Sequence, residues 1–463
     1  MTPPASQDAL HHEDSAVQRD AVYVDHGEAY GNLGEEAMIL NALARIETFL
    51  HPRVIYITHA AGKPLPTGDN PRVRDTPSPF RAFRNATNRL HSAFQKWNWI
   101  PLLRLLLPKD NDVFYWQLAV FLDRWFPAWL DLRKQADVRE FLCALDDCRV
   151  YYHVGMSGLN EFWEPGLVYK GWVLRQARRR VDLVVLSSQG LGPVTRPSAR
   201  REMKGLLEHV DVVSLRDKTY GAKLLAELAV PRVRSEVVFD EAFSFPAASP
   251  ETAEAWLAQS GLSPDEDFVA LHYRETDYTM VATDSVVRLG KILKVARTET
   301  RFKFLFVPMS YAEHSGVDFV LGKKLAGYLG NPDWFCVLPE CRDVSILKAV
   351  VGQARFSMGM SYHINVFSLT QGHPGLILYT GGYYGLKSDE LISFYGPPSV
   401  ALDLDQTTPD QIQNAIREIT ANYESHCQHI AAVNDEMRRI NDWTLEEIRR
   451  RLRIGGAPGK CPP

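Results

Sequence analysis

Short apolar runs rich in β-branched residues alternate with amphipathic helical patterns along most of the chain. The runs that we interpret as strands are "AVYVDH", "RVIYITH", "CRVYYHVG", "VDLVVLSS", "DVVSLRD" and "RSEVVFD" in the first half, and "DFVALHYR", "KFLFVPMS", "WFCVLP", "ARFSMG" and "GLILYT" in the second. A strand that is regularly followed by a helical pattern is typical of parallel sheets with helical crossovers. The pattern therefore predicts an α/β protein with two doubly wound, Rossmann-like lobes.

Two lobes of this kind place a cleft between the carboxyl ends of their sheets, where ligands of doubly wound folds bind. We describe this expected architecture as GT-B-like. The same pattern predicts the segments of the chain: a disordered leader (1–20), a first lobe (21–243) that carries a Trp-rich helical insertion (61–134), a linker (244–264), a second lobe (265–405), a long C-terminal helix packed across both lobes (406–455), and a tail (456–463).

Composition narrows the range of partners. The 463 residues are 45% hydrophobic and carry a formal net charge of -4, so the chain has no overall positive field for nucleic acid. The six cysteines form no C-x-x-C pair and have no histidines at zinc spacing, which predicts free thiols in a reducing compartment and no metal. The polar start of the chain and the lack of a membrane-length apolar run predict a cytoplasmic protein.

The first predicted strand is followed by "YGNLGEEAM", which places Gly31, Asn32 and Gly34 before an amphipathic helix. Glycine, and asparagine among the other residues, adopts the left-handed conformations of sharp turns. Such a turn leaves the first N–H groups of the helix facing the cleft, where they can bind an anion. Glu35 and Glu36 open the helix, and the sequence leaves two interpretations for them: plain helix capping, or a catalytic carboxyl at Glu35.

Seven motifs occur in the order in which the polysaccharide pyruvyl transferase family has them. In the first half, "YGNLGEEAM" resembles the family's G-N-x-G-D/E-x-A signature, "SSQGLGP" its G-Q-G-I-G-P segment, "VSLRDKTYGAKLLAELAVPRV" its V-x-x-R-D block and "FDEAF" its D-x-A-F. In the second half, "ALHYRE" is similar to the strand that ends in arginine, "FLFVPMS" to the strand that ends in Pro-Met, and "SMGMSYHINVFSLTQGHPGLIL" to the M-x-x-H-x-x-x-F-x-L-x-x-G-x-P-x-I segment. The resemblance covers residues 21–402 apart from the insertion.

This resemblance implies a transferase that moves the enolpyruvyl unit of phosphoenolpyruvate onto two hydroxyls of a sugar, releasing phosphate and forming a cyclic pyruvate ketal. Phosphoenolpyruvate would be the donor substrate, and no redox cofactor is implied. The acceptor would be a sugar of a polysaccharide or of a glycan precursor. Two alternatives stay open: a GT-B glycosyltransferase that uses a nucleotide sugar, and a sugar-binding relative without catalytic activity.

Cationic side chains at strand ends are the candidate ligands of an anionic donor. Arg274 ends a second-lobe strand and suits a carboxylate or a phosphate, because a guanidinium binds either group through two hydrogen bonds. The alternative for Arg274 is a surface ion pair with Glu275 or Asp277. Ser310 ends another strand at the same cleft. Arg216 belongs to "LRD", where an internal ion pair is the favoured interpretation.

His363 is the strongest catalytic candidate. It follows Ser361, a good N-cap residue, which places it in the first turn of a helix that faces the cleft. A helix N-terminus lowers the pKa of an imidazole and a bound polyanion raises it, so His363 can act as a base, an acid or a phosphate ligand.

The sequence departs from the common family pattern next to this histidine. Many members have an arginine two residues before it, whereas this chain has Ser361 and Tyr362, which we expect to line the substrate site. Lys387, placed in a loop after the last strand, is the candidate replacement for the missing cation. Tyr383 or Tyr384 of the same segment is placed to stack on a sugar.

The Trp-rich insertion has two interpretations. "KWNWIPLLRLLLPK" combines aromatic, aliphatic and basic residues as interfacial membrane segments do, and peripheral contact with the inner face of a membrane would suit a lipid-linked acceptor. The other interpretation is a helical subdomain packed on the first lobe, or a dimer contact.

Overall fold

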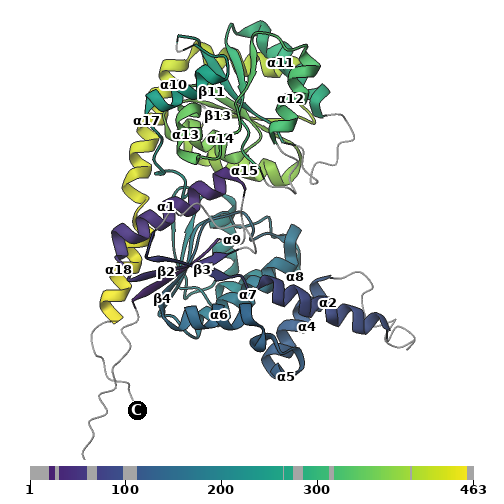
Figure 1. Cartoon of the computed structure of the whole chain (residues 1–463), viewed down its shortest axis with the longest axis vertical. Coiled ribbons are helices and arrows are strands. Elements are labelled where there is room, and N and C mark those ends of the chain that lie inside the picture. Colours follow the sequence, from purple (N-terminus) through teal and green to yellow (C-terminus); the bar gives the residue numbers. More distant parts are fainter. Residues whose placement is uncertain are drawn as a thin grey trace, which may run out of the picture.

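The computed structural model describes residues 20–26, 31–59, 70–96, 112–263, 265–274, 285–311, 318–396 and 399–455. These residues form two parallel sheets, each flanked by helices, which lie one above the other along the longest axis of the molecule (Figure 1). The predicted GT-B-like architecture of two Rossmann-like lobes is confirmed. The predicted leader and tail fall almost entirely outside the described residues.

The first lobe is built on a sheet with the strand order β3-β2-β1-β4-β5-β6-β7. Its strands are β1 (Ala21–Asp25), β2 (Val54–His59), β3 (Val73–Pro77), β4 (Cys148–His153), β5 (Leu183–Gln189), β6 (Val212–Leu215) and β7 (Arg234–Val237). The helices are α1 (Leu33–Leu50), α2 (Phe80–Lys96), α4 (Asp112–Trp125), α5 (Pro127–Leu130), α6 (Ala136–Asp146), α7 (Glu164–Arg178), α8 (Pro197–Leu207) and α9 (Tyr220–Leu228), with short 3-10 turns at Leu132–Lys134 and Glu161–Trp163.

The second lobe has the strand order β10-β9-β8-β11-β12-β13. Its strands are β8 (Phe268–His272), β9 (Lys303–Phe306), β10 (Phe335–Val337), β11 (Phe356–Gly359), β12 (Gly375–Tyr379) and β13 (Ser399–Asp403). Its helices are α10 (Pro250–Gln259), α11 (Ser285–Glu299), α12 (Asp318–Leu329), α13 (Val344–Gly352), α14 (Tyr362–Thr370) and α15 (Gly381–Tyr395), and the chain continues as α16 (Pro409–Ala421), α17 (Tyr423–Ile440) and α18 (Trp443–Gly455).

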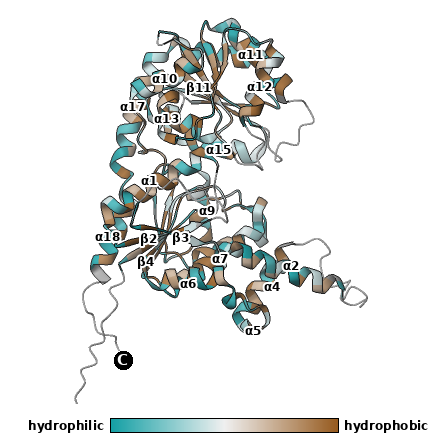
Figure 2. Cartoon of the chain, viewed as in Figure 1, coloured by the Kyte–Doolittle hydropathy of each residue, from teal (hydrophilic) through white to brown (hydrophobic). Residues whose placement is uncertain are grey.

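The central strands are buried on both faces, which is why they read as continuous apolar runs. In β1, Val22 and Val24 pack into a core that includes α1 residues, whereas Tyr23 packs into the core on the opposite face with Trp172 of α7. Successive side chains of a strand point to opposite faces, so one five-residue strand serves both cores. Figure 2 shows apolar residues along the strands, with hydrophilic residues on the outer sides of the helices.

Every predicted strand is present, and the structure adds β3 and β13, each at an edge of its sheet. The strand β3 lies inside the segment 61–134 that the sequence predicts as a helical insertion, and this part of the prediction is wrong. Val73–Pro77 reads "VRDTP", and its exposed Arg74 and Asp75 hide the strand from hydrophobic patterning. Edge strands tolerate such charges. Residues 97–109 of the Trp-rich stretch lie outside the described residues.

The predicted single C-terminal helix is instead three helices. Asn422 ends α16 and precedes α17 with a non-helical backbone (φ -108°, ψ 21°), and Asn441 ends α17. The breaks let successive helices contact different partners: α16 packs on α11, α17 on α14 and α15, and α18 on α1 and β6. The C-terminal segment therefore contacts both lobes.

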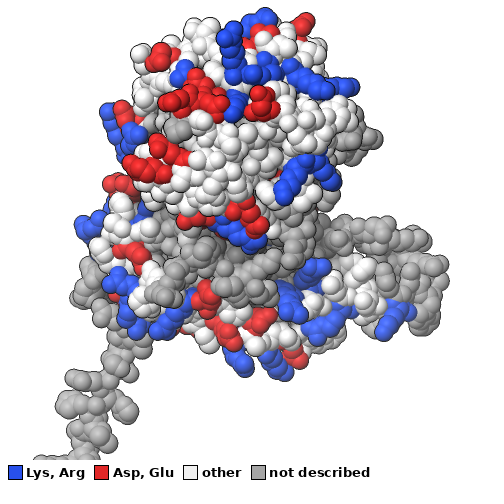
Figure 3. All heavy atoms as spheres, turned by 45° about the horizontal axis from the view of Figure 1, so that its top comes forward, with Lys and Arg blue, Asp and Glu red and all other residues white. Residues whose placement is uncertain are grey.

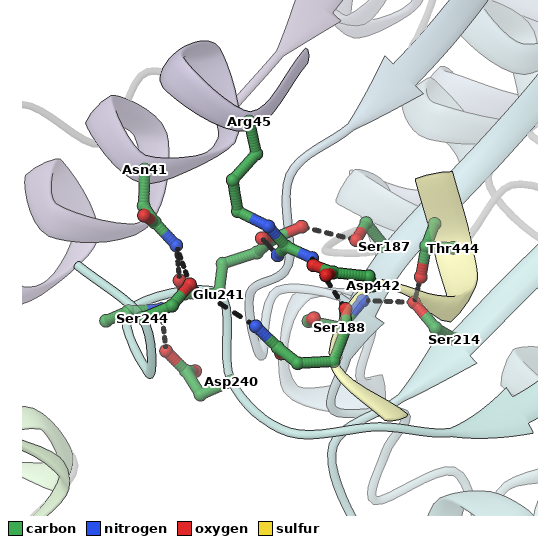
Figure 4. Close-up of polar contacts among 12 residues, drawn as sticks. Asn41, Arg45, Ser187, Ser188, Ser214, Asp240, Glu241, Ser244, Asp442 and Thr444 are labelled. Carbon is green, nitrogen blue, oxygen red and sulfur yellow. Dashed lines mark hydrogen bonds and ion pairs between the residues drawn. The ribbon is translucent and has the colours of Figure 1, made fainter. Parts of the chain in front are cut away.

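The junction between α1, the loop after β7 and the C-terminal segment is polar. Arg45 of α1 pairs with the buried Glu241 at 3.0 Å and with Asp442 at 2.9 Å, while Asn41 donates to the Glu241 backbone (Figure 4). Glu241 also accepts hydrogen bonds from Tyr152 and Ser187. This network fixes the position of α1.

A backbone bridge joins the lobes at the start of α1. The N–H of Leu33 donates to the Met309 carbonyl at 3.0 Å, and the N–H of Tyr311 donates to the Gly31 carbonyl at 2.8 Å. Asn32 and Ser310 form an isolated antiparallel bridge between them. Figure 3 shows Lys and Arg side chains interspersed with Asp and Glu side chains over the face it displays.

Candidate active site

A pocket lies in the cleft between the lobes, next to the start of α1 and the carboxyl ends of β8 and β11. Both lobes contribute to its lining, which consists of Asn32, Glu35, Met38, Met156, Ser157, Arg216, His272, Arg274, Met360, Ser361, Tyr362, His363, Tyr384 and Lys387. Seven of these residues are among the predicted site residues: Asn32, Glu35, Arg274, Ser361, Tyr362, His363 and Lys387. The structure brings them together from segments far apart in the sequence.

The loop before α1 makes a sharp turn, as its glycines predict, but the left-handed conformation is found at Gly31 and not at Asn32. Gly31 has a φ of 79°, in the left-handed region, and its N–H donates to the Glu36 carboxylate at 2.9 Å. Asn32 is extended (φ -103°) at the N-cap position, so the expectation of a left-handed Asn32 is wrong. Its backbone bridge to Ser310 requires an extended strand-like conformation.

The two glutamates at the start of α1 have different surroundings. Glu36 is buried and caps the loop through Gly31, which is the structural interpretation. Glu35 lines the pocket and forms no hydrogen bond or ion pair with another of the described residues. Burial raises the pKa of Glu35 above its ordinary value, although Lys387, Arg274 and Arg216 act in the opposite direction. Its protonated form is therefore favoured relative to an exposed glutamate.

His363 occupies the first turn of α14, with Ser361 as the N-cap residue, as predicted. Its ring packs against Gly34, where an added Cβ would lie 2.1 Å from the imidazole Cγ. The Nε2 atom is buried without a hydrogen-bond partner and lies 3.9 Å from the Asp240 carboxylate. Burial, followed by the charges of Arg216 and the other pocket cations, holds the pKa of His363 well below its usual range. The imidazole is thus neutral before any anion binds.

Arg274 is held by a carboxylate from the second lobe. Its Nε and Nη2 atoms donate to Asp318 at 3.1 and 3.0 Å, and the same carboxylate lies 3.1 Å from His272 Nε2. The Nδ1 atom of His272 accepts the N–H of Ser361 at 3.1 Å, so this chain of contacts also positions the start of α14. The alternative partners Glu275 and Asp277 lie outside the described residues.

Arg216 is a pocket residue, and its predicted internal pair with Asp217 is wrong. Asp217 accepts the N–H groups of Thr219 and Gly221 at the start of α9, and it is not available to the guanidinium. Arg216 instead pairs with Asp240 at 2.7 Å and with Glu390 at 3.0 Å, donates to Ser157, and stacks 4.4 Å from the centre of the Tyr362 ring. Burial raises the pKa of Glu390 to about 7 despite the Arg216 charge.

Lys387 reaches the pocket from α15, so the predicted loop location is wrong. Its Nζ lies 4.8 Å from the centre of the Tyr383 ring, and it makes no ion pair within the described part of the chain. Tyr384 lines the pocket beside it, and Tyr383 contacts Phe162 of the first lobe with ring centres 5.6 Å apart. Of the three pocket cations, Lys387 is thus the one without a carboxylate partner among the described residues.

Three predicted site residues support the site without lining the pocket: Gly31, Gly34 and Ser310. Gly31 accepts the Tyr311 N–H through its carbonyl, Gly34 leaves room for the His363 ring, and the Ser310 hydroxyl donates to the Gly31 carbonyl at 3.2 Å. Sequence reasoning missed the supporting residues Asp240, Asp318, Glu390 and His272, although Asp240 lies in the quoted "FDEAF" and His272 in "ALHYRE". Among the described residues no group of three His, Cys, Asp or Glu side chains is placed to hold a metal ion. None of the described helices is long and apolar enough to cross a membrane.

Solved structures share this fold over nearly the whole chain. HepE from Anabaena, in complex with UDP-glucose, has a TM-score of 0.54 at 11% identity, with 93% of this chain and 99% of that chain covered. MnaA from S. aureus, with UDP, has a TM-score of 0.54 at 10% identity and coverages of 92% and 97%. The α,α-trehalose 6-phosphate synthase of Burkholderia multivorans has a TM-score of 0.54 at 11% identity and coverages of 95% and 99%.

These likenesses and the two parallel sheets define the class of protein, a GT-B fold with a polar site between its lobes. The family follows from the sequence: the model of the polysaccharide pyruvyl transferase family matches residues 32–382. The chain belongs to this family, and it is a transferase. No curated protein matches the sequence.

Proposed function

We propose that the protein transfers the pyruvyl group of phosphoenolpyruvate to a sugar of a polysaccharide or glycan precursor, and that the product is a cyclic pyruvate ketal. One observation carries the proposal: a neutral histidine, a carboxyl with a raised pKa and three cations converge on one pocket. Phosphoenolpyruvate combines a carboxylate and a phosphate, and guanidinium and ammonium groups are the natural ligands of both.

The cations are arranged to bind an anion without moving far. Asp318 fixes Arg274, and Asp240 with Glu390 fixes Arg216, so that little side-chain freedom is lost on binding. Lys387 has no carboxylate partner among the described residues and adds a charge that is not already neutralised. We propose that Lys387 supplies the positive charge that the resemblance to the family leads one to expect at position 361, where this chain has a serine.

The two titratable groups suit opposite proton transfers. Burial favours the uncharged form of each group, which is a protonated carboxyl at Glu35 and a neutral imidazole at His363. Glu35, whose pKa is raised by burial, is the proposed acid that protonates the methylene carbon of the donor. His363, whose pKa is lowered by burial and by Arg216, is the proposed base that takes the proton of the attacking sugar hydroxyl.

The proposed transfer conserves all atoms and protons and needs no oxidation or reduction. Protonation of the methylene carbon forms the methyl group, and the first hydroxyl adds to the adjacent carbon as it loses its proton. The bond from that carbon to the phosphate oxygen then breaks, and the second hydroxyl adds and loses its proton. One of the two hydroxyl protons replaces the proton spent on the methyl group, and the other leaves with inorganic phosphate.

The acceptor sugar has an aromatic surface available at the edge of the pocket. Tyr384 lines the pocket, and Tyr383 contacts Phe162, whose side chain is 56% exposed. Aromatic rings of this kind stack on the apolar faces of sugars while leaving the sugar hydroxyls free to react. We propose that the acceptor, free or lipid-linked, is bound here.

Phosphate release from phosphoenolpyruvate, measured with fractionated glycans as acceptors, tests the proposal. We expect release that needs both a glycan and His363, with a mass gain in the product that corresponds to a pyruvate ketal. The variant His363→Gln should lose release, and His51→Asn, a change at an exposed histidine, is the matched control. A hexose-sized mass gain with a nucleotide sugar would instead establish glycosyl transfer. Full function in cells of His363→Gln would favour a sugar-binding relative without catalysis.

A further inference from the structure

Four large aromatic side chains are exposed together where α4 meets α5. Phe121, Trp125, Phe126 and Trp129 are 50%, 60%, 48% and 77% exposed, and the rings of Phe121, Phe126 and Trp129 follow one another at 5.8 to 6.3 Å between centres. We call these four residues the aromatic tip. Large contiguous exposed apolar groups mark interaction sites on proteins.

The opposite face of α4 explains why the tip stays exposed. Trp116, Ala119 and Leu122 of α4 are buried in the first-lobe core, and the neighbouring Asp123 accepts a hydrogen bond from the Trp172 indole at 2.9 Å. These contacts fix the rotation of α4 about its axis. The aromatic tip therefore cannot turn into the core without breaking them.

A cavity rich in arginine adjoins the aromatic tip, between α4, α7 and α8. Four arginines line it, namely Arg124, Arg175, Arg178 and Arg179, together with His209, whereas Glu202 and Glu208 are its acidic residues. Arg124 links the two features, because its guanidinium lies 5.1 Å from the centre of the Trp125 ring. We call this the arginine cavity.

The positive charge of the arginine cavity is only partly neutralised. Arg178 pairs with Asp211 at 3.0 Å, and Glu202 is engaged by the amide of Gln117. The Nη2 atom of Arg175 is buried without a hydrogen-bond partner, and Arg124 and Arg179 have no ion pair within the residues that the structure describes. An anionic group in the cavity would supply the missing acceptor, and phosphate oxygens match the geometry of guanidinium groups.

The combination of exposed tryptophans with arginines that lack ion pairs favours some classes of binding partner over others. Tryptophan prefers the interface between lipid headgroups and acyl chains, and arginine binds the anionic headgroups next to it. A symmetric dimer through this face would bring the unpaired arginines of both copies together, which is unfavourable. Figure 1 shows α4 and α5 at the end of the first lobe that points away from the second lobe, so docking there leaves the cleft open.

We propose that the aromatic tip and the arginine cavity together form a docking surface for an anionic lipid bilayer, with the aromatic tip in the headgroup region and a lipid phosphate in the cavity. The surface does not depend on the reaction at the cleft, and no step of that reaction is needed for it. It gives the enzyme a fixed orientation at a membrane surface.

Co-sedimentation of the full chain with vesicles tests this proposal without any substrate of the reaction. We expect binding to vesicles of phosphatidylglycerol and phosphatidylcholine, weaker binding at high salt, and little binding to phosphatidylcholine alone. The double variant Trp125→Ser/Trp129→Ser should lose binding. Arg124→Gln/Arg179→Gln should weaken it about fivefold for each arginine. All four positions are exposed, so thermal unfolding should be unchanged.

The matched control is Arg439→Gln/Arg449→Gln, which removes two exposed arginines from α17 and α18 and should leave vesicle binding intact. Several outcomes would overturn the proposal: no binding of the wild type at low salt, equal binding by the tryptophan variant, or a dimer in velocity sedimentation that the tryptophan variant abolishes. Calorimetric binding of inorganic phosphate without vesicle binding would assign the cavity to a soluble anion. Displacement from vesicles by single-stranded DNA at equal charge would assign the surface to nucleic acid.

Discussion

Gly34 of the first lobe and His363 of the second lobe are in direct contact, and a Cβ added to Gly34 would lie 2.1 Å from Cγ of the imidazole ring. The contact sits beside the backbone bridge between Asn32 and Ser310. The glycine is required here because α1 approaches the histidine too closely for any side chain. The lobes thus meet at the residue that we propose as the catalytic base.

Gly34→Ala should therefore reduce activity strongly, because the methyl group must displace the His363 ring or separate the lobes. Misplacement of a catalytic group by about 1 Å costs about a hundredfold in rate, and we expect a loss of at least that size in kcat/KM for phosphate release. Gly205→Ala in α8 is the control, since an added Cβ there meets no atom within 4 Å. Activity within a few-fold of wild type for Gly34→Ala would mean that the ring position is not critical.

Lys387→Met should raise the KM for phosphoenolpyruvate by about 10- to 100-fold, the effect of losing one hydrogen bond to a charged group. The change should affect KM more than kcat, because Lys387 is assigned to donor binding and not to proton transfer. Steady-state kinetics of phosphate release measures both constants. Lys291→Met, at an exposed position on α11, should match the wild type. A variant with unchanged KM would exclude Lys387 as the replacement for the family arginine.

The sequence predicts the two lobes well, because strands buried on both faces appear as apolar runs with helices between them. It also places His363, since Ser361 at the N-cap and a preceding strand fix the start of α14. This pattern does not reveal the edge strands β3 and β13. It also does not reveal the breaks between α16, α17 and α18. Their positions depend on pairing and packing with distant parts of the chain.

The role of Arg216 shows why part of the site could not be predicted. Its ion-pair partners Asp240 and Glu390 lie 24 and 174 positions away in the sequence, whereas Asp217 is its neighbour and is used to cap α9. Closeness in the sequence favours Asp217 as the ion-pair partner of Arg216, but in the folded protein Arg216 pairs with the two distant residues. Lys387 was misplaced for a related reason: Leu391, Phe394 and Tyr395 are buried by tertiary contacts that turn the expected loop into α15.

The protein should become less stable as the pH is lowered, because His153 is buried beside Asp25 and Lys170. Burial, followed by the Lys170 charge, lowers the pKa of His153 to about 3. Between this value and the unfolded pKa of about 6.5, the unfolded chain binds one more proton than the folded chain. Stability is therefore lost as pH falls below about 6.5, with a slope of about 1.4 kcal/mol per pH unit from this group.

His153→Asn should reduce that slope between about pH 4.5 and 6, a window above the unfolded pKa of aspartate. Urea unfolding at a series of pH values measures the slope. His51→Asn is the control, because His51 is exposed with a φ of 49°, a left-handed conformation that asparagine tolerates. An identical pH slope in His153→Asn and wild type would show that His153 is not the source of the acid sensitivity.

The buried pair of Arg45 and Glu241 makes the strongest stability prediction (Figure 4). The Glu241 side chain is fully buried and the Arg45 side chain is 12% exposed. Arg45→Met therefore leaves a buried carboxylate whose remaining partners among the described residues are the hydroxyls of Tyr152 and Ser187. Breaking a buried pair on one side costs about 3–5 kcal/mol of the free energy of unfolding. Arg149→Met, which removes a surface pair with Asp182, should cost at most about 1 kcal/mol.

The stability loss in Arg45→Met has two possible causes, an unpaired buried carboxylate or a loss of packing. A double variant that removes both charges distinguishes them. In Arg45→Met/Glu241→Gln the uncompensated negative charge is gone, and we expect the double variant to recover part of the stability that Arg45→Met loses. Denaturant unfolding of the four proteins in this cycle gives the coupling energy. If the two losses simply add, the cost of Arg45→Met comes from its lost contacts with the C-terminal segment, where it donates to the Asn441 carbonyl and pairs with Asp442. The carboxylate of Glu241 would then already be satisfied by the two hydroxyls.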